Sequence, residues 1–197
     1  LLVRRFESSF GAFAKTVGSM ISIHEKVRKL SKPVSEGGKG VIILDRVMME
    51  RFCAMEDDPE ADFEQALEDY EAEIEIESEK KQVYHVDTDF TKEGYAEFLK
   101  NLDADCELFL EVKKEVENLD LVANDPKAKQ LCEIIAKVLT GNAGFKHHAG
   151  EPKRKVLVFS EYADTVDHLA KYLKDAFPGK VAVVRQLSKE TADKVRR

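Results

Sequence analysis

The stretch KVLVFSEYADTVDHLAKYL, residues 155–173, decides the fold that this sequence predicts. A continuous apolar run at residues 156–159 ends abruptly at a polar turn, and a helical pattern of apolar side chains starts near Asp164. Such an arrangement is typical of one βα unit of a parallel sheet that is covered on both faces. A second unit is expected to follow, with a strand at residues 181–184 and a helix capped by Ser188.

The rest of the chain is predicted to be mainly helical, because its apolar residues repeat at helical spacing. The expected helices cover residues 1–30, 41–55, 63–74, 91–118 and 126–140. Thr91 and Asp125 are the expected N-caps of the last two helices, and Gly141 is expected to end the second of them. Residues 82–90 are predicted to form an extended segment. The predicted fold class is therefore α/β, predominantly helical, with long helices packed beside a short βα region.

Length and composition indicate a globular protein of one or two domains without a membrane span. The chain has 197 residues, 43% of them hydrophobic, which is enough for one large domain or two small ones. No apolar run is long enough to span a bilayer, and no signal-peptide pattern is present. The three cysteines are scattered and lack CxxC spacing, so they favour thiols in a reducing cytoplasm over a disulfide framework or a zinc site. Both ends fall inside apolar helical patterns, so an excised fragment is expected.

The net charge of -7 conceals a strong segregation of charge along the sequence. Residues 1–55 carry ten Lys and Arg against five Asp and Glu, and residues 127–197 carry fifteen against eight. The middle, residues 56–126, carries the remaining six bases and twenty-five acids, and residues 56–79 contain no base at all. A phosphate-binding surface is therefore expected at the two ends of the chain and not in its middle.

Three segments resemble one family of proteins. The pattern KVLVFS-x4-T-x3-L, which begins at Lys155, resembles motif IV of superfamily-two helicases, particularly the Swi/Snf-type ATPases and their bacterial relatives. The segment DPKAKQLCEII, residues 125–135, resembles the sequence that precedes the second RecA-like lobe in those proteins. The segment LLVRRFESSFGAF, residues 1–13, resembles the RR-[LF]-ESS helix of bacterial helicase-like proteins. The three segments occur in the family's order.

The resemblance implies a domain organisation. Residues 1–150 would form a helical region between the two lobes, with an acidic middle at residues 56–79. Residues 151–197 would form the N-terminal part of the C-terminal RecA-like lobe, which is truncated. The long helices would then pack beside a truncated RecA-like parallel βα unit. The partners implied are duplex DNA and the first RecA-like lobe of the same parent chain, with no membrane. The sequence does not distinguish DNA from RNA.

An ATP-driven translocase needs a phosphate cradle with a lysine, carboxylates that hold magnesium, and arginines that stabilise the transition state. This chain contains no GxxxxGK[ST] phosphate loop, no DE motif and no motif VI. ATP and magnesium are therefore expected as cofactors of the parent protein, whereas the fragment is expected to bind neither and to be inactive alone. No catalytic or metal-binding residue is predicted.

The resemblance also nominates residues that would contact a nucleic-acid backbone, at the turns where ligands of open parallel sheets bind. They are Ser160, Glu161, Tyr162 and Thr165 at the first turn, Arg185, Gln186, Ser188 and Lys189 at the second, and Arg4 and Arg5 near the N-terminus. Independently of the resemblance, Lys153, Arg154 and Lys155 form a basic entry to the strand that could steer a phosphate. Relatives often have glycine in place of Gln186. The alternative interpretation is that these are ordinary turn, cap and surface residues.

One face of the predicted helix at residues 1–30 carries a stripe of small and basic residues: Arg4, Ser8, Gly11, Lys15, Ser19, Ser22, Lys26 and Lys29. It suits close approach of a phosphate backbone, and equally a solvated face.

Two other functions remain open on sequence grounds. The first is a helical protein-interaction module whose acidic middle docks a basic partner and which has no nucleotide chemistry. The second is a receiver-like or other small α/β domain with helices appended. A receiver needs an acidic cluster at its strand ends to hold magnesium, and the expected strands here end in Ser-Glu and Arg-Gln.

Overall fold

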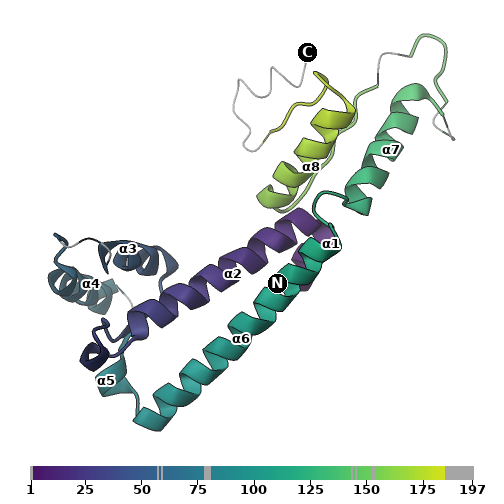
Figure 1. The fold of residues 1–197 in the computed structure, drawn as a ribbon. Helices are drawn as coiled ribbons and strands as arrows, with labels where there is room; N and C mark the ends of the chain where they lie inside the picture. The colour runs from purple at the N-terminus through teal and green to yellow at the C-terminus, as the bar shows by residue number, and fades with distance from the viewer. Residues whose placement is uncertain are drawn as a thin grey trace. The chain divides into compact units, whose positions relative to one another are not determined.

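A computed structural model describes residues 2–56, 58, 60–77, 81–142, 144, 146–151 and 154–184 of the chain, and Figure 1 labels its helices. The described chain is mostly helical. It divides into two compact units, each considered by itself below: one of residues 1–17 and 113–197, the other of residues 18–112. In this division α1 (Leu2–Ser8) falls in the same unit as α7 (Pro126–Thr140) and α8 (Ala163–Ala176).

In the described part of the unit of residues 1–17 and 113–197, the regular elements are all helices. This unit contains α1, the first part of α2 (Phe10–Ser31), the end of α6 (Lys92–Asn118), and the pair α7 and α8, which pack against each other. Asp125 caps α7 with its carboxylate, which accepts hydrogen bonds from the backbone N–H groups of Lys127 and Ala128. Gly141, at φ 72°, ends α7 in the left-handed conformation that glycine adopts without strain. Both helix ends lie where the sequence predicted them.

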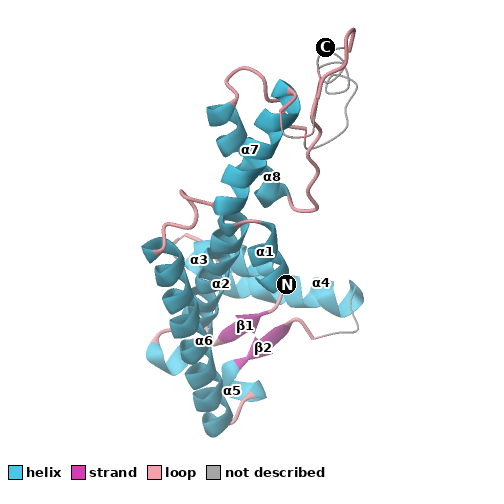
Figure 2. Ribbon diagram, turned by 90° about the vertical axis from the view of Figure 1, so that its right-hand side faces the viewer, coloured by secondary structure: helices cyan, strands magenta, loops and turns pink. Residues whose placement is uncertain are grey.

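The unit of residues 18–112 contains the sheet, drawn in magenta in Figure 2. Strands β1 (Val41–Ile43) and β2 (Val83–His85) pair antiparallel, with Ile42 opposite Tyr84. The other elements of this unit are the 3-10 turn η1 (Val34–Glu36) and the helices α3 (Arg46–Glu56), α4 (Phe63–Glu77) and α5 (Val86–Asp89), with parts of α2 and α6.

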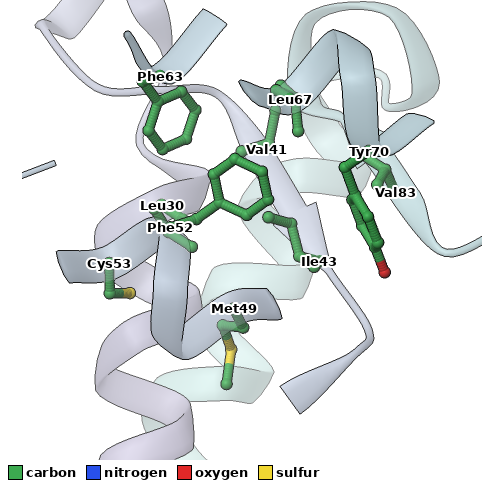
Figure 3. Close-up of a cluster of buried hydrophobic side chains, with 10 residues drawn as sticks. All are labelled: Leu30, Val41, Ile43, Met49, Phe52, Cys53, Phe63, Leu67, Tyr70 and Val83. Atoms are coloured by element: carbon green, nitrogen blue, oxygen red, sulfur yellow. The ribbon is translucent and has the colours of Figure 1, made fainter. Parts of the chain in front are cut away.

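A hydrophobic core holds this second unit together, and Figure 3 shows its side chains. Phe52 of α3 is fully buried at its centre and meets the rings of Phe63 and Tyr70 from α4, at centroid distances of 5.1 and 6.0 Å. Tilted and edge-on aromatic contacts of this kind add stability beyond the burial of apolar area. The remaining core residues are Leu30, Val41, Ile43, Met49, Cys53, Leu67 and Val83.

Most of the helices predicted from sequence are present, with two corrections. Residues 41–43 are a buried strand and not the first turn of a helix, since this β-branched run pairs with β2 and α3 begins only at Arg46. The long N-terminal helix is interrupted at Ser9, which separates α1 from α2. The predicted extended segment at residues 82–90 contains β2 and the short α5, and Thr91 accepts a hydrogen bond from the Gly94 N–H at the start of α6.

Neither predicted strand of the parallel sheet forms in the described part of the chain. Residues 156–159 and 181–184 are irregular. Leu157 and Phe159 are 67% and 86% exposed. A strand is stable only when its backbone groups pair with a neighbour, and an apolar run with no partner strand stays in contact with solvent. The chain is therefore mostly helical with a small antiparallel sheet, and the predicted α8 is present without the strand expected before it.

None of the described helices is long and apolar enough to cross a membrane.

Candidate nucleic-acid interface

The candidate site lies in the unit of residues 1–17 and 113–197, where the start of α8 meets α1 and the start of α2. Asp164, in the first turn of α8, binds a cation with each carboxylate oxygen. Its Oδ2 lies 3.2 Å from a terminal guanidinium nitrogen of Arg5, and its Oδ1 lies 2.5 Å from Nζ of Lys15. The hydrogen bond from Lys15 and the positive charges of Lys15 and Arg5 hold the pKa of Asp164 below its usual value.

Tyr162 holds the guanidinium of Arg5 from a second side. The central guanidinium carbon lies 4.2 Å from the centroid of the Tyr162 ring, a cation–π contact. Nε of Arg5 is buried and has no hydrogen-bond partner among the described residues. The Arg5 side chain as a whole is 21% exposed, so part of the guanidinium reaches solvent.

Ser8 and Thr165 form a direct contact between α1 and α8. Their hydroxyl oxygens are 2.8 Å apart, and either can donate the hydrogen bond. Thr165 is only 2% exposed, so in this structure its hydroxyl faces the protein. These two residues are the first serine of the RRFESS sequence and the threonine of the motif IV-like pattern, 157 positions apart in the chain.

The turn before α8 is formed by local hydrogen bonds. The Ser160 hydroxyl accepts a hydrogen bond from the Tyr162 N–H at 3.3 Å. Glu161 is exposed, and Tyr162 is half-buried against Arg5. Of the residues nominated at this turn, Ser160 shapes the turn, Tyr162 and Thr165 contact the N-terminal helices, and Glu161 faces solvent.

The segment Asp125–Pro126–Lys127 binds the backbone groups that the helix break at Ser9 leaves without partners. Lys127 Nζ donates to the carbonyl oxygens of Phe6 and Glu7 in the last turn of α1, at 2.7 and 2.9 Å. On the other side of the break, the Phe10 N–H donates to Oδ2 of Asp125 at 3.4 Å. The DPK sequence thus supplies both a donor and an acceptor where the N-terminal helix is interrupted.

Asp125 is fully buried and connects α7 with α8 as well. His168 Nε2 lies 2.9 Å from Asp125 Oδ2, and the Tyr172 hydroxyl accepts a hydrogen bond from the Asp125 N–H at 2.9 Å. The His168 ring lies so close to Gly11 of α2 that any Cβ at that position would overlap it. Gly11 therefore permits the close approach of α2 and α8.

The small and basic stripe on the N-terminal helix makes contacts within the protein. In the first unit, Ser8 meets Thr165, Gly11 meets His168 and Lys15 meets Asp164. In the second unit, Lys26 and Lys29 lie 3.5 and 3.4 Å from the carboxylates of Glu50 and Glu56 in α3. The stripe is therefore not a fully solvated face, because several of its side chains already contact other helices.

The other nominated residues fall into three groups. Arg4 is exposed on α1. Arg154 binds Glu151 through two nitrogens, at 2.8 and 3.0 Å, and donates to the carbonyl oxygens of Val138 and Lys146, so it anchors the loop after α7. Lys155 is exposed and interacts with the chain. Lys153, Arg185, Gln186, Ser188 and Lys189 lie outside the described residues.

Sequence reasoning missed the partners of the nominated residues. Lys15 and Asp164 are 149 positions apart, and Lys127 and Phe6 are 121 apart, so no local pattern joins them. The one local signal of these contacts is the DPK sequence. Its aspartate is a predicted N-cap of α7, but the pattern does not indicate that Asp125 and Lys127 also bind the backbone of the N-terminal helices. The described residues include no cluster of histidine, cysteine or carboxylate side chains that could hold a metal ion.

No protein-family model, no curated protein and no solved structure matches this chain.

Proposed function

We propose that this chain is part of a helicase-like, ATP-dependent DNA translocase, in which it contributes packing between the lobes and contacts to the nucleic-acid backbone. The parent protein would bind ATP and magnesium through residues that this sequence lacks. The chain would by itself hydrolyse no ATP. In this proposal residues 156–159 form a strand of a RecA-like parallel sheet in the parent. The partner strands would lie in the rest of the parent, which explains why this apolar run is exposed and irregular here.

The observation that carries the proposal is the contact between Ser8 and Thr165. The resemblance to helicase-like ATPases rests on three segments that are distant in the sequence. In the structure all three lie in one compact unit: RRFESS meets the motif IV-like helix at Ser8 and Thr165, and DPK binds both through Asp125 and Lys127. This arrangement supports the proposal that the three segments belong to one functional region of the chain.

Arg4, Arg5 and Lys155 are the described basic residues proposed to face the phosphate backbone. Arg4 of α1 and Lys155, in the irregular segment before α8, are exposed, and Arg5, next to Arg4 on α1, is part-exposed. Arg154 is proposed to act mainly through the loop that it anchors, because its guanidinium is already bound to Glu151 and to two carbonyl oxygens.

The test is binding of the whole chain to a labelled duplex DNA of 30 base pairs, measured by fluorescence anisotropy over a series of NaCl concentrations. Binding should weaken steeply with salt, since each lysine or arginine on a phosphate contributes about 0.9 to the slope of log K against log salt. The variant Arg4→Gln/Lys155→Gln should lower the slope by roughly 1 to 2.

The matched control is Lys92→Gln/Lys100→Gln, which removes the same charge from exposed positions of α6 in the other unit. It should change the slope little. Absence of binding at low salt, or equal losses in the two double variants, would contradict the proposal. Repeating the series with single-stranded DNA and with RNA duplex identifies the preferred nucleic acid.

The second candidate is a protein-interaction module with an acidic docking surface and no nucleotide chemistry. The observation in its favour is the outer face of α4, where every exposed charged residue is acidic: Glu64, Glu68, Asp69, Glu73 and Glu75. The opposite face, with Phe63, Leu67 and Tyr70, is buried in the core of its unit. A chain that fails to bind DNA but captures a basic peptide, and loses it when these five residues become Gln or Asn, would favour this candidate.

A further inference from the structure

We propose that Asp164 occupies the place of a nucleic-acid phosphate between Arg5 and Lys15, so that its carboxylate competes with the backbone for these two cations. This inference rests on the proposed function and concerns how strongly the same site binds. Asp164 is neither a catalytic residue nor a contact to the ligand in this view. It is an internal anion that lowers the affinity of the site.

The geometry of the three charged groups carries the inference. Each oxygen of the Asp164 carboxylate binds one cation, Arg5 at 3.2 Å and Lys15 at 2.5 Å. The two non-bridging oxygens of a phosphodiester make the same demand, since each accepts hydrogen bonds from lysine or arginine. The pair Arg5 and Lys15 is therefore spaced for one oxyanion group with two acceptor oxygens, and that position is filled from within the chain.

Arg5 would keep its position without Asp164. The cation–π contact with Tyr162, at 4.2 Å, holds the guanidinium from the ring face. Among the described residues, the one hydrogen bond of this guanidinium goes to Asp164, and the part of the side chain that solvent reaches, 21%, leaves donor capacity for an external anion. A guanidinium fixed by an aromatic ring and incompletely hydrogen-bonded is ready to bind a second anion.

Solvent can reach the ion pairs, so an external anion can displace Asp164. The side chains of Arg5, Lys15 and Asp164 are 21%, 66% and 26% exposed. Ion pairs that solvent can reach are weak. A phosphate backbone that contacts several cations at once can therefore displace this carboxylate. The net free energy of DNA binding is smaller than it would be without Asp164, because the ion pairs with Asp164 are lost.

Neutralising Asp164 should strengthen DNA binding beyond the effect of net charge. We expect Asp164→Asn to tighten binding to the labelled duplex on the order of 3- to 10-fold near 100 mM NaCl, and to steepen the salt slope by about 1 to 2, as one or two phosphate contacts are gained. The control Asp175→Asn makes the same change of charge in the last turn of α8, where the carboxylate is exposed. It should tighten binding much less.

Two further variants separate the possible outcomes. Asp164→Ser, whose side chain suits the first turn of a helix, must give the same gain, and thermal unfolding followed by circular dichroism checks that each variant is folded. In the background Arg5→Gln/Lys15→Gln, the substitution Asp164→Asn must no longer increase the affinity for DNA, because no cations remain to be released.

Equal gains in affinity for Asp164→Asn and Asp175→Asn, or a gain that persists in that background, would overturn the inference while DNA binding itself stands. If neither wild type nor variants bind at low salt, the proposed function fails and takes this inference with it.

Discussion

Gly11 shows how one missing side chain determines the packing of two helices. A Cβ at this position would overlap the ring of His168, and that ring is fixed by its hydrogen bond to the buried Asp125. Overpacking of a rigid contact forces backbone or ring displacement and costs typically about 1–3 kcal/mol. We expect Gly11→Ala to lower the free energy of unfolding by this amount, measured by urea denaturation.

Gly18 provides the matched control in the same helix. It has open space around its Cβ position, so Gly18→Ala creates no clash. Alanine is better than glycine inside a helix by roughly 0.5–1 kcal/mol, and Gly18→Ala should therefore stabilise the chain. Effects of the same sign for the two substitutions would contradict the role assigned to Gly11.

Glu151 is predicted to make stability depend on acid pH. The hydrogen bonds from Arg154 and from the His148 N–H lower the pKa of Glu151 from 4.5 to about 2. A carboxyl group whose pKa is lower in the folded state stabilises the fold above its unfolded pKa, and this contribution is lost as the pH falls through the folded value. The difference in Tm between wild type and Glu151→Gln should therefore be largest above about pH 4.5 and shrink between pH 4.5 and 2. A difference that grows toward acid pH would contradict this assignment, and Glu133→Gln, an exposed position of α7, controls for the loss of one acidic charge.

At the scale of elements, the contact between α1 and α8 depends on two hydroxyl groups. Ser8→Ala and Thr165→Val each remove one partner of the 2.8 Å hydrogen bond and leave the other hydroxyl part-buried. Each single variant should lose about 1 kcal/mol of stability, as is usual for one hydrogen bond. The double variant should lose less than the sum, with a coupling energy of roughly 0.5–1.5 kcal/mol. Strict additivity would show that the two hydroxyls do not interact in solution.

The elements also show what local sequence patterns can predict. The long helices and the caps at Thr91 and Asp125 could be predicted, because periodicity and capping act within a few residues. The break at Ser9 was not predicted: the Ser9 hydroxyl accepts a hydrogen bond from the Ala12 N–H, a local cap, but the other groups that bind the free backbone come from Asp125 and Lys127, more than a hundred positions away. The strand at residues 41–43 was mistaken for helix because Val41, Leu44 and Met48 also fit helical spacing.

In the candidate site, too, only part of the arrangement could be predicted from the sequence. Arg5, Tyr162 and Thr165 were nominated by resemblance, and the structure brings them together around Asp164 and Ser8. Asp164 and Lys15 were not nominated, because a carboxylate that binds two cations across 149 positions leaves no pattern in the sequence. The apolar run at residues 156–159 was recognised, but whether such a run forms a strand depends on partner strands, which the run does not specify.

At the scale of the whole molecule, the two compact units differ in what stabilises them. The unit of residues 18–112 has a hydrophobic core around Phe52, whereas the other unit buries the polar side chains of Asp125 and Thr165 together with apolar residues such as Phe10 and Val17. Phe52→Ala should destabilise the chain by about 3–5 kcal/mol through loss of burial and a new cavity. Leu44→Ala, at a position 58% exposed, should change stability by less than about 0.5 kcal/mol. Both are measured by urea denaturation, and similar losses for the two variants would contradict a core centred on Phe52.

The interruption of the N-terminal helix at Ser9 has a consequence for biosynthesis. A ribosome that adds about 5–20 residues per second reaches Lys127 roughly 6–25 s after it has made Phe10. Helices form within about a microsecond, so the nascent chain has time to build one continuous helix across Ser9 before the DPK segment exists. On this expectation the break forms only when Asp125 and Lys127 bind the Phe10 N–H and the Phe6 carbonyl. A nascent chain arrested before residue 125 is therefore expected to carry a straight helix across Ser9, and an interrupted helix in that arrested chain would contradict this expectation.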